Sequence, residues 1–202
     1  MIGAYPGSFD PPTVAHVAIV EAARRLLSLR RVDLVLSRSA LGKEHGHAVR
    51  LEDRVGVLAT MATTRPWLAW KVTDAQLLVD VAAGYDVLIV GADKWAQVID
   101  PAWYGGSVEA RDDAVARLPQ VLVVPRPPLP APSGVASLEL PSAEVAENAE
   151  VSSSAVRAGR YEWMAPEAAA FAEESGAWID PERYAAWVAA SGGGGSEEAA
   201  PD

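Results

Sequence analysis

Short runs of apolar residues alternate along this chain with longer segments in which apolar residues recur every three or four positions. A continuous apolar run bounded by turn residues predicts a buried strand, whereas the wider spacing predicts an amphipathic helix. The predicted strands are 1–5, 32–37, 68–72, 87–90 and 121–124, with a weaker one at 137–140. The predicted helices are 13–29, 51–64, 75–83 and 108–118, followed by C-terminal helices at 153–159, 166–175 and 181–190.

Strands and helices that alternate in this way are typical of a parallel sheet covered on both faces. We therefore expect an α/β fold, a Rossmann-like doubly wound parallel sheet with helices on both faces and a short helical extension at the C-terminus. Ligands of such sheets bind beyond the carboxyl ends of the strands. Residues 1–190 are expected to form a single domain, in which the Pro-rich stretch 125–132 is a stiff connector. The Gly-rich and then acidic residues 191–202 are expected to be a disordered tail.

Composition narrows the range of partners. The chain of 202 residues is 50% hydrophobic, contains no Cys and has a formal net charge of -10. A chain without Cys has no disulfide, no thiolate nucleophile and no Cys-bound metal, and the negative charge argues against a broad nucleic-acid surface. No segment has the apolar length of a membrane span, and the N-terminus enters a strand without the pattern of a signal peptide. We expect a cytoplasmic protein whose partners are small molecules, with neither nucleic acid nor a membrane among them.

The first candidate site is the turn formed by residues 7–16, with the sequence G-S-F-D-P-P-T-V-A-H, between the first strand and the first helix. Thr13 is expected to cap the helix, and His16 lies on the same side of its first turn. Unpaired main-chain N–H groups and the helix dipole favour an anion there, so the turn suits a triphosphate. The alternative is ordinary capping with a surface His.

A second candidate site is the helix start at residues 151–157, with the sequence V-S-S-S-A-V-R. Ser153 or Ser154 is expected to cap this helix and to offer a hydroxyl, and Arg157 lies one turn further along the same edge. The segment therefore suits β- and γ-phosphates. The alternative is an ordinary Ser cap with a solvated Arg.

Lys43 lies in a polar loop that follows the second predicted strand, and we expect this loop to close over substrate. The alternative is a solvated Lys. His45 and His47 come directly after it, but two His without a third ligand are insufficient for a metal site.

The strand 87–90 runs into a turn with Gly91 and Asp93, and Trp103 follows after a short interval. Trp103 could stack on a planar ligand, or it could simply pack against the protein. Arg126 follows the predicted strand 121–124.

The first two candidate sites resemble the signature of the nucleotidyltransferase superfamily. Residues 7–16 resemble its G-x-F-D-P-x-[HT]-x-G-H motif, with Thr13 in place of the first His of many members and Ala15 in place of Gly, and residues 151–157 resemble its I-S-S-T-x-x-R motif. The G-x-D of residues 91–93 with a downstream Trp resembles nicotinate-mononucleotide adenylyltransferases. Thr13 and the segment 74–82 instead resemble phosphopantetheine adenylyltransferases. The acceptor-side motifs of both groups are only partly present.

The resemblance implies roles for individual residues. It implies that His16, Thr13 and Lys43 are catalytic. It implies that a nucleotide is held by Gly7, Ser8, Phe9, Asp10, His16, Gly91, Asp93, Ser152, Ser153, Ser154 and Arg157. It implies that an acceptor contacts Lys43, Trp103 and Arg126. No residue is assigned to a metal, because Mg²⁺ would arrive with ATP, and the resemblance is compatible with a homo-oligomer.

The same resemblance implies transfer of the AMP moiety of ATP to a phosphorylated small molecule, with release of pyrophosphate. The favoured acceptor is nicotinate or nicotinamide mononucleotide, which would place the chain in NAD biosynthesis. The alternatives are a phosphopantetheine adenylyltransferase-like enzyme, a cytidylyltransferase-like enzyme that uses CTP, and a nucleotide-binding module without catalytic activity. Retention of His16, Lys43, Ser153 and Arg157 favours an enzyme over such a module.

Overall fold

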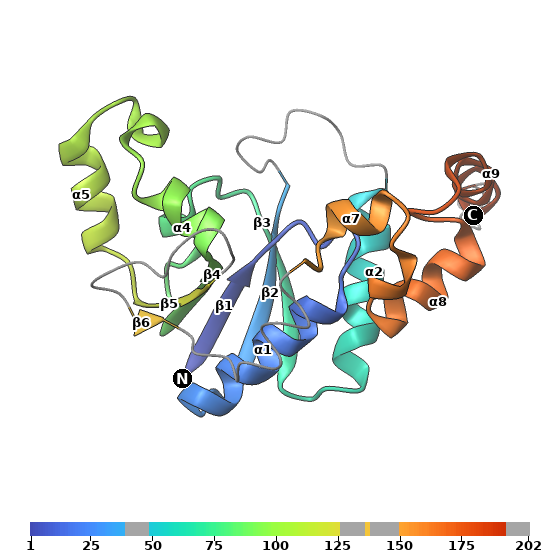
Figure 1. Cartoon of the computed structure of the whole chain (residues 1–202), viewed down its shortest axis with the longest axis horizontal. Coiled ribbons are helices and arrows are strands. Elements are labelled where there is room, and N and C mark those ends of the chain that lie inside the picture. The colour runs from blue at the N-terminus through green and yellow to red at the C-terminus, as the bar shows by residue number, and fades with distance from the viewer. Residues whose placement is uncertain (39–48, 126–135, 138–149, 193–202) are drawn as a thin grey trace, which may run out of the picture.

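The computed structural model describes residues 1–38, 49–125, 136–137 and 150–192 (Figure 1). Within these ranges one 6-stranded sheet has the order β3-β2-β1-β4-β5-β6, and every neighbouring pair of strands is parallel. The carboxyl ends of the strands therefore share one edge of the sheet. The strands are β1 (Ile2–Pro6), β2 (Arg31–Ser37), β3 (Leu68–Thr73), β4 (Val87–Gly91), β5 (Gln120–Val124) and β6 (Ala136–Ser137).

Helices cover both faces of the sheet. They are α1 (Val14–Leu27), α2 (Leu51–Thr63), α3 (Leu78–Val81), α4 (Ala92–Val98), α5 (Val108–Ala116), α7 (Ser153–Arg157), α8 (Pro166–Ser175) and α9 (Pro181–Gly192), with short 3-10 helices η1 (Pro101–Tyr104) and η2 (Tyr161–Trp163). Strand side chains alternate between the faces: Val87 and Ile89 pack with α1, α2 and α8, whereas Leu88 and Val90 pack with α4 and α5. The predicted α/β fold with a C-terminal helical extension is confirmed.

The order of the strands locates the place for a ligand. The chain winds outward from β1 to β2 and β3 on one side, and from β4 to β5 and β6 on the other. In such sheets ligands bind outside the carboxyl ends of the two strands at which the winding reverses. Here these strands are β1 and β4, which pair with Gly3 opposite Val87.

The helix predicted at 75–83 is shorter in the structure, because the main chain of Ala75 bonds to side chains. Its N–H donates to Thr73 Oγ1 (3.1 Å), and its carbonyl oxygen accepts from Ser37 Oγ (2.8 Å). These bonds compete with helical hydrogen bonding, and α3 begins only at Leu78. The weak strand predicted at 137–140 corresponds to β6, and residues 138–140 lie outside the described ranges.

Helix α4, which follows β4 without a loop, was not predicted. Ala92, Trp95 and Val98 are buried and form one apolar face at helical spacing. At the other end of the chain, α9 extends to Gly192, into the segment expected to be a disordered tail, and residues 193–202 lie outside the described ranges.

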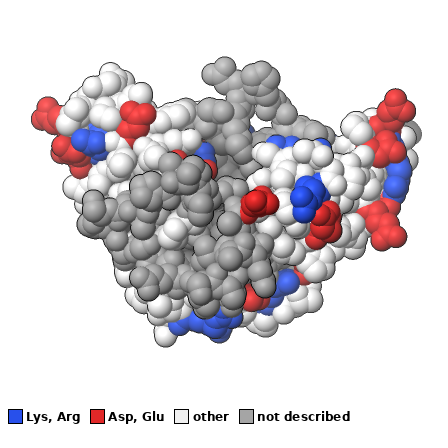
Figure 2. Space-filling model, in the orientation of Figure 1, with Lys and Arg blue, Asp and Glu red and all other residues white. Residues whose placement is uncertain are grey.

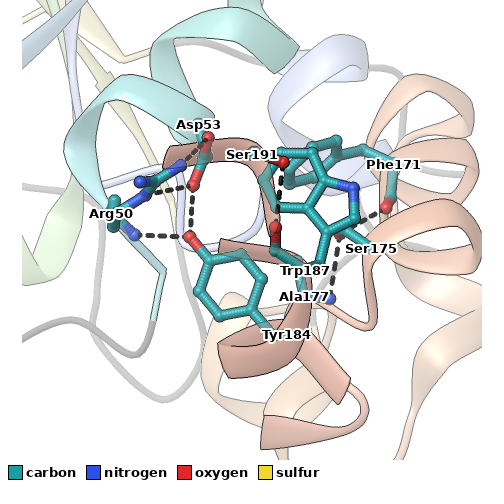
Figure 3. Close-up of polar contacts among 8 residues, drawn as sticks. All are labelled: Arg50, Asp53, Phe171, Ser175, Ala177, Tyr184, Trp187 and Ser191. Atoms are coloured by element: carbon teal, nitrogen blue, oxygen red, sulfur yellow. Dashed lines mark hydrogen bonds and ion pairs between the residues drawn. The ribbon is translucent and has the colours of Figure 1, made fainter. Parts of the chain in front are cut away.

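The C-terminal helices brace the start of α2 (Figure 3). Tyr184 of α9 donates its hydroxyl to the Asp53 carboxylate and accepts the main-chain N–H of Arg50 (3.0 Å). The Arg50 guanidinium pairs with the same carboxylate at 2.8 Å. Burial, with the hydrogen bond to Asp53, raises the pKa of Tyr184. Trp187 packs edge-on against Phe171 of α8 at 5.4 Å between ring centroids, so α8, α9 and α2 are joined close to the carboxyl edge of the sheet.

On the described part of the face in Figure 2, acidic side chains gather at both ends of the molecule, while Lys and Arg occur in small groups. This distribution agrees with the formal net charge of -10. Among the described helices, none is long and apolar enough to span a membrane.

Candidate active site

Residues 7–13 form a turn that folds back over the carboxyl end of β1. The Gly7 N–H donates to Val35 O of β2 (3.0 Å). The Phe9 side chain points into the core, and 1% of the residue is exposed. A Cβ at residue 7 would lie 2.8 Å from Phe9 Cζ, so glycine is required for this packing. Phe9 adopts a left-handed φ of 45°, whose cost of roughly 1 kcal/mol is offset by burial of the ring. The ring therefore supports the turn from within.

His16 is held at the first turn of α1 in one orientation. The main-chain N–H of Thr13 donates to His16 Nδ1 (2.9 Å), and the Thr13 hydroxyl lies 2.7 Å from the same nitrogen. The Phe9 ring packs against the imidazole at 5.2 Å between centroids. Because a main-chain N–H can only donate, Nδ1 must accept, and the neutral ring carries its proton on Nε2. The structure thus assigns Nε2 as the donating nitrogen of His16.

Thr13, which contacts His16, is fully buried, with 0% of its surface exposed. It is the N-cap residue of α1, as predicted. Its hydroxyl and its main chain both contact His16, so its part in the site is to orient that imidazole. Its main chain also forms an antiparallel bridge with Met164.

Asp10 is the buried carboxylate of the turn, with 4% of its surface exposed. Trp178 Nε1 donates to Asp10 Oδ1 (2.6 Å) across 168 residues of sequence. Arg157 Nη1 lies 3.8 Å from Asp10 Oδ2 and also donates to the Asp10 carbonyl oxygen. The residues around Trp178 form a turn in which Trp178 has a φ of 64°. This turn aims the indole at Asp10.

The second motif closes against the first, as the two candidate sites would require. Ser153 Oγ donates to the Pro11 carbonyl oxygen (2.7 Å), and the Ala165 N–H donates to the Pro12 carbonyl oxygen (3.0 Å). The helix cap is Ser152, which accepts the Ala155 N–H at 3.1 Å, and not Ser153 or Ser154 as predicted. Val151 is buried and Ser152 is extended, so the helix begins at Ser153, one residue earlier than a cap at Ser153 would require.

Arg54 is a site residue that the sequence analysis did not select. It lies in the first turn of α2, 4% exposed, and its Nη1 donates to the Ser8 carbonyl oxygen (2.8 Å). Burial lowers its pKa, and the negative charge of Asp10 acts in the opposite direction. Within the described ranges its Nε has no hydrogen-bond partner. The E-x-R pattern at residues 52–54 was the available signal, since it opens the helix that follows the loop of Lys43.

A second part of the site lies between β1 and α4. Gly91 ends β4 and caps α4, and a Cβ there would lie 2.6 Å from Asp93 Oδ1, so glycine makes room for that carboxylate. A hollow of about 90 Å³ is lined by residues of the turn 7–13 and of β1, β2, α3, α4 and η1. The residues that line it include Gly7, Ser8, Val35, Ser37, Gln76, Leu77, Leu78, Lys94, Gln97, Trp103 and Tyr104.

The structure therefore brings most of the predicted positions together at the carboxyl ends of β1 and β4. Trp103 lines the hollow, as an acceptor-binding residue would. Lys43 and Arg126 lie outside the described residues. In the part of the chain that is described, no three His, Asp or Glu side chains come together as metal ligands.

The arrangement is suited to binding anions. The Arg157 guanidinium, the Nε2–H of His16 and the Ser154 hydroxyl are positive or donating groups gathered around one turn, and charge-assisted hydrogen bonds are the stronger kind. Asp10 offers little to a cation, since it accepts from Trp178 and faces Arg157. An anionic ligand that enters between the two motifs would meet donors from both.

Trp178→Phe tests the contact that joins the C-terminal segment to the turn. The variant keeps an aromatic ring but removes a donor from a buried carboxylate, which is expected to lower the free energy of unfolding by about 1–3 kcal/mol. Urea denaturation measures the change. Trp70→Phe, at an exposed position on β3, is the matched control and should change stability by less than about 0.5 kcal/mol. Equal losses in the two variants would contradict the role given to Trp178.

The family model described as cytidylyltransferase-like matches residues 4–159. Phosphopantetheine adenylyltransferases from two strains of Cereibacter sphaeroides are each 37% identical over 59 residues, which is 29% of this chain and 33% of theirs. The chain thus spans about a third of the length of these curated relatives.

Two solved structures share the fold. One is Plasmodium falciparum nicotinic acid mononucleotide adenylyltransferase complexed with NaAD, with a TM-score of 0.62 at 13% identity, over 89% of this chain and 97% of that one. The other is the same enzyme complexed with APC, with a TM-score of 0.59 at 13% identity over the same shares.

Proposed function

Because this chain belongs to the cytidylyltransferase-like family of nucleotidyltransferases, we propose that it transfers the AMP moiety of ATP to a phosphorylated small molecule and releases pyrophosphate. The nucleotidyltransferase resemblance drawn from the two sequence motifs is confirmed by this membership. One observation carries the proposal: Ser153 and Arg157 of the second motif bond to Pro11 and Asp10 of the first, so that His16 and the second motif can act on one polyphosphate.

The proposed reaction joins two phosphates. An oxygen of the acceptor phosphate attacks the α-phosphorus, the bond from that phosphorus to the bridging oxygen breaks, and pyrophosphate leaves with the electron pair. The acceptor phosphate is already ionised near neutral pH, so no residue has to remove a proton. The protein then contributes by holding two anions in line and by stabilising the charge that develops.

The residues divide this work between them. His16 donates from Nε2 to the α-phosphate or the bridging oxygen, where negative charge increases in the transition state. Ser154 and Arg157 hold the β- and γ-phosphates and then the pyrophosphate, while Ser153, whose hydroxyl donates to the Pro11 carbonyl oxygen, keeps the second motif against the first. Lys43 would reduce repulsion between donor and acceptor. Mg²⁺ enters as part of the ATP complex, coordinated by phosphate oxygens and water, because Asp10 already has its own partners.

We assign the acceptor to the hollow between β1 and α4, and we favour nicotinate or nicotinamide mononucleotide. Gly7 and Ser8 of the turn 7–13 line this hollow, and so does Trp103, on which a planar ring could stack. The second candidate is phosphopantetheine, which the relatives from Cereibacter sphaeroides are named for. CTP remains the alternative nucleotide because of the family to which the chain belongs.

Pyrophosphate release tests the proposal. ATP and CTP are each combined with nicotinate mononucleotide, nicotinamide mononucleotide and phosphopantetheine, with the nucleotide alone as the control. We expect release with ATP that depends on a pyridine mononucleotide. Nucleotide binding without release from any pair would instead support a binding module that lacks catalytic activity.

A further inference from the structure

Trp178 makes a buried contact to which no role in the reaction has been given so far. It lies in the turn between α8 and α9 with 7% of its surface exposed, and its Nε1 donates to Asp10 Oδ1 at 2.6 Å. Its φ of 64° is a left-handed conformation that a bulky residue rarely adopts. The turn and the Phe171 ring, 5.9 Å away between centroids, hold the indole in this place.

The two oxygens of the Asp10 carboxylate face different partners. Oδ1 accepts from Trp178, whereas Oδ2 lies 3.8 Å from Arg157 Nη1. A charge-assisted hydrogen bond between a guanidinium and a carboxylate is about 2.7–2.9 Å long, so this ion pair is a loose one. An Asp carboxylate can rotate over a broad range of angles, and the bond from Trp178 opposes this rotation.

A loose ion pair leaves the Arg157 guanidinium available to a ligand. Its Nη1 donates to the main-chain carbonyl oxygen of Asp10, and its Nη2 lies 3.4 Å from Ser154 Oγ. A guanidinium has five N–H donors, so donors remain for an anion. The Arg157 side chain is 38% exposed and lines a cavity of about 550 Å³ together with Trp178, where an anion can reach it.

Loss of the indole N–H would change the balance between Asp10 and Arg157. Asp10 is 4% exposed, and a buried carboxylate that loses a donor is left with an unsatisfied oxygen. Arg157 already forms an ion pair with this carboxylate, so rotation toward Arg157 would satisfy the oxygen and make the pair tight. The guanidinium would then be neutralised by Asp10 instead of by the phosphates of a nucleotide.

We propose that Trp178 is a positioning residue of the phosphate site. Its indole N–H occupies one oxygen of the Asp10 carboxylate, and this keeps Arg157 free to bind the β- and γ-phosphates of the nucleotide. The inference rests on the proposed function for the role of Arg157, and it adds a residue that acts on the phosphates without touching them. Because Trp178 prevents competition by Asp10, its effect depends on the negative charge of that side chain.

Isothermal titration calorimetry of the full chain with inorganic pyrophosphate and Mg²⁺ tests the inference. Trp178→Phe keeps an aromatic ring without the donor and should weaken pyrophosphate binding about tenfold, because hydrogen bonds to charged groups are among the stronger ones. Trp178→His places a ring N–H where the indole had one but leaves a cavity in place of the second ring. It should be less stable than Trp178→Phe and yet bind pyrophosphate within about threefold of wild type.

The charge of Asp10 supplies the next comparison. In the Asp10→Asn background the competing charge is absent, so adding Trp178→Phe should change pyrophosphate affinity by less than about twofold. In the Arg157→Gln background the affected cation is absent, and adding Trp178→Phe should again have an effect of less than about twofold. Trp187→Phe is the matched control, because this indole packs against Phe171 within the C-terminal helices (Figure 3). It should bind pyrophosphate like wild type.

The binding measurements separate this inference from the proposed reaction. Wild-type affinity in Trp178→Phe, an equal loss of affinity with Trp178→Phe in the Asp10→Asn background, or an equal loss in Trp187→Phe would overturn the role of Trp178. A loss in Trp178→His as large as in Trp178→Phe, or no binding of pyrophosphate to wild type, would overturn it as well. The expected pattern of affinities without pyrophosphate release from any nucleotide and acceptor would contradict the proposed reaction and leave the role of Trp178 supported.

Discussion

Replacing His16 by Ala is expected to lower kcat by about 10²–10³-fold while the dissociation constant of ATP changes little, because one donor aimed at developing charge contributes about that much. Nδ1 is occupied by the Thr13 N–H at 2.9 Å, so the ring acts through Nε2. An interaction that forms mainly in the transition state lowers kcat rather than ground-state binding. Steady-state kinetics of pyrophosphate release and calorimetry with ATP measure the two quantities.

His16→Gln is the matched control for this prediction. A Gln at the third helical position can still bond to the main-chain N–H of the capping residue, as in a capping box, so the variant preserves the helix start but not the Nε2–H. We expect its stability to match wild type and its kcat to fall as in His16→Ala. If either variant lost ATP affinity while kcat stayed at the wild-type value, His16 would be a ground-state binding residue instead.

Arg54→Met is expected to lower the free energy of unfolding by about 2–3 kcal/mol, because the part-buried Ser8 carbonyl loses its donor and the buried Asp10 loses a nearby positive charge. The melting temperature should fall by about 2–4 °C for each kcal/mol in a chain of this size. Differential scanning calorimetry measures the shift. Because Arg54 holds the turn at 2.8 Å from Ser8 O, kcat/KM should fall as well.

Arg117→Met provides the comparison for Arg54. Arg117 is 64% exposed in its side chain and lies 3.8 Å from Asp80, and exposed pairs of this kind contribute about 0–1 kcal/mol. A loss of stability in Arg54→Met no larger than in Arg117→Met would show that the buried guanidinium does not hold the turn.

The sheet and its larger helices could be predicted from the sequence because their burial follows a simple period. β4 is a continuous apolar run between turn residues, and α8 runs from Pro166 to Ser175 as predicted. The N-cap position of Thr13 was also predictable, since it depends on residues close to one another in the chain. The helix predicted at 75–83 is shorter in the structure, because its start does not depend on helical spacing alone. The hydroxyls of Ser37 and Thr73 form hydrogen bonds with the main chain of Ala75 and compete with helical hydrogen bonds there.

The candidate site was predictable only in part, because half of its contacts join distant segments. The two motifs could be found separately, but the bond from Trp178 to Asp10 spans 168 residues and has no local pattern. Lys94 and Gln97 were missed together with α4, because the segment after β4 was interpreted as a turn. Once that segment is helical, the two side chains lie one turn apart and line the same hollow.

The fate of the α-phosphorus of ATP tests the central proposal most directly. The full chain is incubated with α-labelled ATP, Mg²⁺ and nicotinate mononucleotide. The labelled products are separated and quantified, and the pyrophosphate released is measured in parallel. We predict that the label enters a dinucleotide in an amount equal to the pyrophosphate, and that His16→Ala forms neither product at a comparable rate. Label that stayed in ATP, or that appeared as AMP without a dinucleotide, would contradict nucleotidyl transfer to this acceptor.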